Sequence, residues 1–233
     1  MLTITQAVER AIGASPIYGE AILQKIVNFS SLARKIKLSI EEFLLEPVSE
    51  GSITIALKRL AADLRKSRSP LGSAFPIRNI ALRSGLTSLV YQNSPALEMI
   101  HHQILSKSRL NDTFIHFAQG SHESSFMLSE SCLLPLQKLA ASEKRVAEYR
   151  HLSSISVRMP PEAMQIPGVF APFVQALAWQ QISVIQIVSY FTEITFVVSD
   201  ADADRAFSVI NDLSKKSVPR YVRQSRSSSD RSH

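Results

Sequence analysis

The sequence contains few of the residues on which several classes of protein depend. Among its 233 residues there are one cysteine, Cys132, and seven glycines. A single cysteine cannot form an internal disulfide, so the chain does not need an oxidising compartment. The few glycines form no Gly-rich loop of the kind that surrounds phosphate groups. No apolar run approaches the ~20 residues that a membrane helix needs, so we expect no membrane association.

Residue patterns of catalytic and metal sites are also missing. The six histidines show neither the HExxH motif nor a Cys/His zinc spacing. His116, His122 and Glu123 surround a predicted turn and form a loose metal candidate, for which surface positions are the simpler interpretation. Cys132 lacks the neighbouring histidine and acid of a nucleophile, and we interpret it as a small buried residue. We therefore predict that the protein is not an enzyme and needs no cofactor or metal.

The composition is that of a globular protein whose positive charge is concentrated at one end. Hydrophobic residues make up 45% of the chain and charged residues 20%, which is typical of a soluble fold. The formal net charge is +6, and residues 214–233 carry six basic groups and one acidic group. Because this end is rich in Ser and Arg, we predict a disordered basic tail at 215–233. The first residues lack the pattern of a signal peptide, so a cytoplasmic location is the default expectation.

The first part of the chain, residues 1–68, has the periodicity of a helical module. Apolar residues recur at helical spacing and predict short helices over 3–13, 21–27 and 32–36. The strongest pattern predicts a longer helix over 49–66, with an apolar stripe on one side and polar and basic residues off that stripe.

A short helix, a connection and a longer helix with basic residues outward is the pattern of a helix-turn-helix or winged-helix module. The connection predicted here, 37–47, with a further helical turn over 39–45, is much longer than the usual turn of three or four residues. We predict that these polar and basic residues contact DNA: Arg34, Lys35, Ser49, Ser52, Lys58 and Arg59. The alternative is a solvated helix face whose charge is balanced by nearby acids such as Glu41 and Glu50.

A linker separates this module from two similar series of elements. In the second series, residues 152–214, a strand over 155–159 precedes Pro167-Gly168, and apolar residues at helical spacing follow. Two β-branched runs over 182–188 and 194–198 predict strands, and an acidic segment then opens a last helix. The predicted order is β-α-β-β-α.

The first series, residues 77–142, has the same order of elements. Asn93-Ser94-Pro95 opens its first helix in place of Pro167-Gly168, and Gln119 to Ser121 form the turn of a hairpin. The charged residues 143–152 bridge to the second series. The strands of the first series are predicted over 86–92, 113–118 and 124–128.

The second series resembles an ACT domain, the amino-acid-sensing module best known from the regulatory half of aspartate kinases. The resemblance rests on Pro167-Gly168-Val169-Phe170, on Thr192 to Val198, and on the acidic start of the last helix. Phe29 to Ile36, with Val48 to Gly51, look like the N-terminal module of predicted regulators of amino acid metabolism that pair such a module with ACT. The resemblance implies an α+β chain, in which a helical, winged-helix-like module precedes two ferredoxin-like βαββα ACT units.

An ACT unit does no chemistry and binds a small amino acid between the strand-to-helix loop of one unit and a strand of its partner. A helix start suits this role because it offers unpaired N–H groups to a carboxylate. The alternative is that Pro167-Gly168 is only a turn and that the units serve only for dimerisation. By resemblance, the ligand loop consists of Gln165, Ile166, Pro167, Gly168, Val169 and Phe170, and the facing strand contributes Gln186, Ile187, Val188 and Ser189.

The resemblance therefore implies a ligand-responsive regulator, acting on transcription in amino acid metabolism, that forms a homodimer through its ACT units. Its partners would be a small amino acid and DNA. The alternative, from another class of protein, is an allosteric or scaffolding subunit that binds a protein partner and no nucleic acid.

Overall fold

The computed structural model of the chain describes residues 2–67, 77–107 and 113–216. It divides into two compact units, residues 1–73 and 74–233. None of the helices within the described residues has both the length and the apolar character that a membrane crossing requires. The tail predicted at 215–233 lies outside the described residues, apart from the two lysines that end the last helix.

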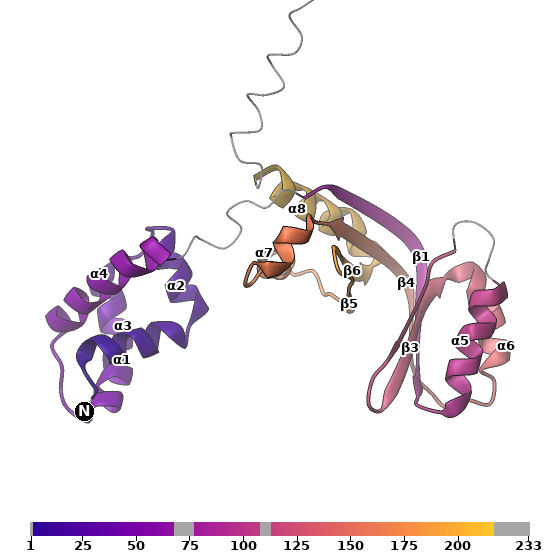
Figure 1. The fold of residues 1–233 in the computed structure, drawn as a ribbon, viewed down its shortest axis with the longest axis horizontal. Coiled ribbons are helices and arrows are strands. Elements are labelled where there is room, and N and C mark those ends of the chain that lie inside the picture. Colours follow the sequence, from indigo (N-terminus) through magenta and orange to yellow (C-terminus); the bar gives the residue numbers. More distant parts are fainter. Residues whose placement is uncertain (1, 68–76, 108–112, 217–233) are drawn as a thin grey trace, which may run out of the picture. The chain divides into compact units, whose positions relative to one another are not determined.

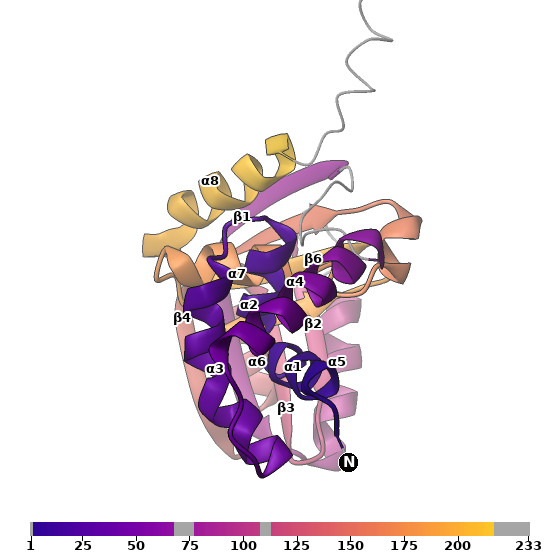
Figure 2. The ribbon, with the colours of Figure 1, turned by 90° about the vertical axis from the view of Figure 1, so that its left-hand side faces the viewer.

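In the described residues of unit 1, four helices surround one apolar core (Figure 2, indigo to purple). Two of the helix starts are fixed by side chains. Thr3 Oγ1 accepts the N–H of Gln6 in a capping box, and Asn28 Oδ1 accepts the N–H groups at the start of the third helix. The helices are α1 Ile4–Gly13, α2 Pro16–Leu23, α3 Phe29–Leu44 and α4 Glu50–Ser67.

The third helix is much longer than the predicted segment 32–36. Its buried residues Leu32, Ile36 and Ile40 continue one stripe at a spacing of four, and α3 ends only where Leu45 takes a left-handed φ of 57°. The connection to α4 is therefore short, and the expectation of a long connection is wrong. Residues 2–67 contain no strand, so the part of the chain that the structure describes shows no wing.

Unit 2 is built on a six-stranded antiparallel sheet in the order β2-β3-β1-β4-β6-β5. The strands are β1 Asn79–Gln92, β2 Ile115–Gln119, β3 Glu123–Ser129, β4 Arg145–Arg158, β5 Gln186–Ser189 and β6 Glu193–Ser199. Helices α5 Pro95–Lys107 and α6 Leu133–Leu139 pack at one end of β1 and β4, and α7 Ala171–Trp179 and α8 Ala203–Lys216 at the other end (Figure 1). Short 3₁₀ helices are η1 Glu130–Cys132, η2 Pro161–Gln165 and η3 Asp200–Asp202. The order β-α-β-β-α thus occurs twice.

Three predicted segments of unit 2 differ in the structure. The strand predicted over 86–92 is only the second half of β1, which begins at Asn79. The predicted bridge 143–152 is wrong, because β4 already begins at Arg145. The predicted strand over 182–188 is shorter, because β5 begins only at Gln186. Ile182 is buried in the core under α7 and α8, and its N–H donates to the Leu177 carbonyl instead of to a strand. Apolar β-branched residues suit a buried loop as well as a strand, so the sequence pattern alone does not show where the loop ends and the strand begins.

The two long central strands, β1 and β4, join the repeats, because each strand begins in one repeat and ends in the other. Residues 79–83 at the start of β1 pair with residues 154–158 at the end of β4, next to β6. Ile77 and Ile80 accordingly pack against the core of the second repeat. The second half of β1 pairs with the start of β4 beside β3. Neither repeat therefore has a complete sheet of its own.

At the centre of this exchange, each long strand carries one extra residue. Leu86 and Leu152 lie directly opposite each other, and the register shifts on both sides of this pair. The residue before each leucine has a left-handed backbone, with a φ of 69° at Gly85 and 55° at His151. These are paired β-bulges, one in each strand, and a left-handed backbone favours glycine over residues with a Cβ.

One bulge has a glycine at the left-handed position and the other has a histidine, so substitutions at the two positions should have opposite effects. Gly85→Ala should lower the free energy of unfolding by about 1 kcal/mol or more, because alanine is strained at a positive φ. The effect comes from the backbone alone, since no atom beyond the two neighbouring residues of the chain lies within 4 Å of the position that a Cβ would take. His151→Gly should raise stability by up to about 1 kcal/mol, because it relieves the same strain. Chemical denaturation of both variants measures this, and a loss of stability in His151→Gly would contradict it.

Candidate functional site

The predicted ligand loop is a tight turn between η2 and α7. Gly168 has a φ of 75°, so the backbone is in the left-handed region at this point. The N–H of Val169 donates to the Ile166 carbonyl at 3.2 Å, and the N–H of Ala171 donates to the Gly168 carbonyl at 2.9 Å. The Val169 side chain is buried in the core of the repeat, while Ile166 is exposed. A buried anchor thus holds a loop whose backbone is strained for residues other than glycine.

The predicted facing strand is β5, at the edge of the sheet. Val188 is buried, and Ile187 is 47% exposed. Within the part of the chain that the structure describes, no hydrogen bond joins this strand to the residues 165–170. Within one chain, the loop and the strand are therefore not joined by hydrogen bonds among the residues that the structure describes.

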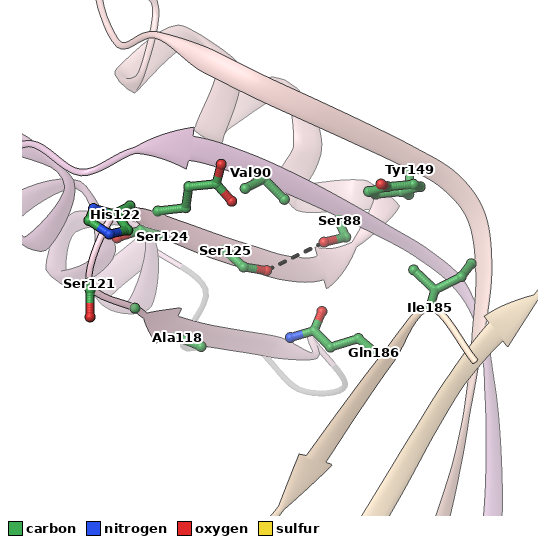
Figure 3. Close-up of a pocket in the computed structure, with 12 residues that line it drawn as sticks. Ser88, Val90, Ala118, Ser121, His122, Ser124, Ser125, Tyr149, Ile185 and Gln186 are labelled. Carbon is green, nitrogen blue, oxygen red and sulfur yellow. Dashed lines mark hydrogen bonds between the residues drawn. The ribbon is translucent and has the colours of Figure 1, made fainter. Parts of the chain in front are cut away.

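A cavity of about 650 Å³ lies on the face of the sheet that the helices leave free (Figure 3). Strands β1 to β4 form most of it, the β2–β3 hairpin forms one wall, and Ile185 and Gln186 enter from the second repeat. Gln186 is the one predicted ligand residue that lines it. Other lining residues are Ser88, Val90, Ala118, Ser125 and Tyr149.

The two opposite edges of the sheet approach each other near this cavity. His116 in β2 and Tyr190 just after β5 share a hydrogen bond of 3.1 Å between the histidine Nδ1 and the tyrosine hydroxyl. The sheet is therefore strongly coiled, and side chains of both repeats meet on its helix-free face. The side chains that meet there form an apolar cluster, which consists of Leu86, Met127, Leu152, Val188 and Val197, with Phe114 packed against it.

Burial of His116 gives unit 2 a pH dependence. Burial, and to a smaller extent the neighbouring His101, lowers the pKa of His116 below its ordinary 6.5. The unfolded chain therefore binds a proton near pH 6.5 that the folded chain does not bind. Stability is present above pH 6.5 and is lost as the pH falls from there toward the folded pKa.

We expect the free energy of unfolding of the wild type to fall between pH 7 and pH 5, and to fall less in His116→Gln. Denaturation curves at several pH values measure both slopes. His122→Gln is the matched control, because it makes the same change at an exposed histidine of the neighbouring hairpin. Equal slopes in the wild type and His116→Gln would contradict the prediction. The burial of His101 also lowers its pKa, so some slope should remain in every variant.

The predicted DNA-contacting residues of unit 1 fall into two groups. The Ser49 hydroxyl accepts the N–H of Ser52 at 3.1 Å and so caps α4, and Arg34 lies 3.6 Å from Glu50. These residues have structural partners at the start of α4. The second group is exposed and, among the described residues, has no acid within ion-pair distance: Lys35, Lys58 and Arg59.

The metal candidate suggested by His116, His122 and Glu123 is not assembled. Among the described residues, no group of three His, Cys, Asp or Glu side chains is close enough to hold a metal ion. Sequence reasoning missed the cavity and the contact between the sheet edges. Both depend on the coiling of the sheet, for which Tyr190 and Ser88 give no local signal.

Comparison with known proteins gives matches by structure only. No protein-family model matches the chain, and neither does any curated protein sequence. The aspartate kinase of Clostridium acetobutylicum is similar in structure, with a TM-score of 0.50 and 14% identity over 60% of this chain and 35% of the kinase. The ligand-free regulatory subunit of aspartate kinase from Thermus thermophilus has a TM-score of 0.49 and 13% identity, over 60% of this chain and 98% of the subunit.

The chain thus spans about a third of the length of the Clostridium kinase that it matches. At this identity the likeness shows a shared fold. It agrees with the predicted α+β class, a mixture of helices and an antiparallel sheet.

Proposed function

We propose that the chain is a non-catalytic regulator that responds to a small amino acid, which binds at the Gly168 loop of unit 2. The observation that carries the proposal is the loop itself. A glycine with a φ of 75° lies three residues before the start of a helix of nine residues, in a repeat of β-α-β-β-α order. Such a loop lets a carboxylate approach the positive end of the helix dipole. The attraction would come from the dipole, because the N–H groups of Val169 and Ala171 donate within the turn and Pro172 has no N–H.

The second wall of this site would come from β5 of another copy of the chain. The outer edge of β5 has no neighbouring strand in the sheet. Large apolar side chains in and just after this strand are exposed, with exposed fractions of 47% for Ile187 and 72% for Phe191. An open edge with apolar neighbours favours pairing with a second strand. A homodimer through this edge would place Gln186 to Ser189 opposite the loop of the partner.

A thermal-shift screen over the twenty amino acids tests the proposal. A ligand that binds only the folded state raises the melting temperature, by an amount that grows with the ratio of its concentration to the Kd. We expect one or a few amino acids to raise the melting temperature in a saturable way. A flat response to all twenty at millimolar concentration would contradict the proposal.

For unit 1 we propose DNA as the partner, because Lys35, Lys58 and Arg59 are exposed cations without acids in ion-pair distance among the described residues. The alternative is a protein partner. Anisotropy of labelled duplex DNA, measured with the full chain at two salt concentrations, distinguishes the two. Replacing Lys58 and Arg59 together by Gln should weaken binding and reduce its salt dependence.

The matched control is Lys138→Gln with Lys144→Gln, which removes the same charge from exposed positions of unit 2. Equal binding by the two double variants would mean that the affinity is a property of net charge and not of α4. That result would favour the protein partner.

A further inference from the structure

The cavity on the helix-free face contains no residue of the Gly168 loop and shares only Gln186 with the proposed amino-acid site, and its floor is polar but uncharged. Ser88 in β1 is 3% exposed, and its hydroxyl lies 3.5 Å from the Ser125 hydroxyl in β3, at the outer limit of a hydrogen bond. Both hydroxyls keep capacity for further hydrogen bonds. Figure 3 shows Gln186 extending from β5 toward β2 across the same space. A ligand on this floor would meet two hydroxyls and an amide.

The rim of the cavity supplies one negative charge and one aromatic ring. Glu123 and His122 belong to the exposed hairpin between β2 and β3, and Tyr149 in β4 is 47% exposed. The cavity lining includes no Lys or Arg among the residues that the structure describes. An anionic ligand would lose its hydration here without a compensating cation and would be repelled by Glu123. A neutral or cationic ligand meets neither cost.

The hairpin wall is held in place by its own polar contacts. Asn93 Nδ2 donates to the Gly120 carbonyl at 2.7 Å, and the Ser124 hydroxyl donates to Asn93 Oδ1 at 2.7 Å. The N–H of Gly120 donates to the Glu123 carbonyl at 2.8 Å. Outside the lining, a hydrogen bond of 3.1 Å between His116 in β2 and Tyr190 after β5 holds the two edges of the sheet together. The site therefore has walls that are formed without a ligand, so little ordering is needed on binding.

We propose that this cavity binds a small polyhydroxylated molecule of monosaccharide size that is neutral or carries an amino group. Its hydroxyls bond to Ser88, Ser125 and Gln186. The C–H face of its ring packs on Tyr149, and an ammonium group lies near Glu123. The volume of about 650 Å³ is sufficient for one such ring with water around it. Because the lining comes from both repeats, the bound ligand would stabilise the coiled form of the sheet.

Three pyranoses of similar size and different charge test the proposal: glucosamine, glucose and glucuronate. Each is titrated into the full chain while the backbone amide signals are followed by NMR. We expect saturable shifts at the amides of Ser88, Ser125 and Gln186 with glucosamine and glucose, and none with glucuronate. The proposal is overturned if none of the three gives saturable shifts at these amides, or if glucuronate binds as well as glucosamine.

Glu123→Gln removes the rim charge and keeps the shape of the side chain. Glucosamine should then bind about two- to fivefold more weakly, as for the loss of an exposed ion pair, and glucose should be unaffected. Glu162→Gln is the control, because it removes an exposed carboxylate from η2, outside the cavity. An unchanged preference for glucosamine in Glu123→Gln would overturn the assignment of the ammonium group.

Two further variants separate this site from the amino-acid site. Ser125→Ala should weaken binding of glucose and glucosamine at least threefold and leave the response to amino acids unchanged. Gly168→Ala should do the reverse. If Ser125→Ala binds both sugars as tightly as the wild type, the floor assignment is wrong, whatever the outcome at the Gly168 loop.

Discussion

Alanine in place of both Leu86 and Leu152 is expected to remove most of the stability of unit 2. The two side chains are 1% exposed and lie directly opposite each other where the long strands cross between the repeats. Each single Leu→Ala change should cost about 2–5 kcal/mol, since it removes buried methyl groups and leaves a cavity. Domains are typically stable by about 5–15 kcal/mol, so the double variant should be close to unfolding at 25 °C.

The two losses should not be additive, because Leu86 and Leu152 belong to one buried cluster and the space left by one deletion adjoins the space left by the other. A double-mutant cycle by urea denaturation should give an interaction energy of about 0.5–3 kcal/mol. Leu134→Ala is the control, since Leu134 is 67% exposed and its loss should cost less than about 0.5 kcal/mol. Single losses below 1 kcal/mol at Leu86 and Leu152 would show that the centre of the sheet is not the packed junction described here.

Phe196→Ala should have the second largest effect, a loss of about 3–5 kcal/mol. Phe196 in β6 is fully buried, and its ring centroid lies 5.8 Å from that of Phe173 in α7. Because β1 and β4 exchange half-strands, the repeats should unfold together. Native-state hydrogen exchange should therefore show the same loss of protection in β3 of the first repeat as in β6.

The control for this experiment is Phe191→Ala, which removes a phenyl ring that is 72% exposed near the same strand. It should leave the protection of both strands within about 0.5 kcal/mol of the wild type. A loss of protection confined to β6 after Phe196→Ala would contradict a single cooperative unit and would show that the repeats unfold separately.

The sequence predicted the elements whose pattern is local. The stripe of α4 and the strand β6 both follow from residues that are close together in the chain. The start of α4 near Ser49 was also predicted, although this serine was assigned to DNA. Its hydroxyl is used by the Ser52 N–H.

The parts that could not be predicted depend on residues far apart in the sequence. The charged segment before Leu152 has no strand pattern of its own, and it becomes a strand because the second half of β1 pairs with it. The cavity forms because His116 and Tyr190, 74 residues apart, come within hydrogen-bond distance. A pattern read along one segment contains no information on which edges of a coiled sheet meet.

Calorimetric titration of Gly168→Ala tests whether unit 2 binds a small amino acid at the Gly168 loop, as we propose. The amino acid found in the thermal-shift screen is titrated into the wild type and into the variant. Alanine is strained at a φ of 75°, which should cost about 1 kcal/mol of stability, and its methyl group would crowd the carboxylate. We expect a folded variant that binds the amino acid at least tenfold more weakly than the wild type. Equal affinity in a well-folded Gly168→Ala protein would contradict the proposed site, because the loop would then be only a turn.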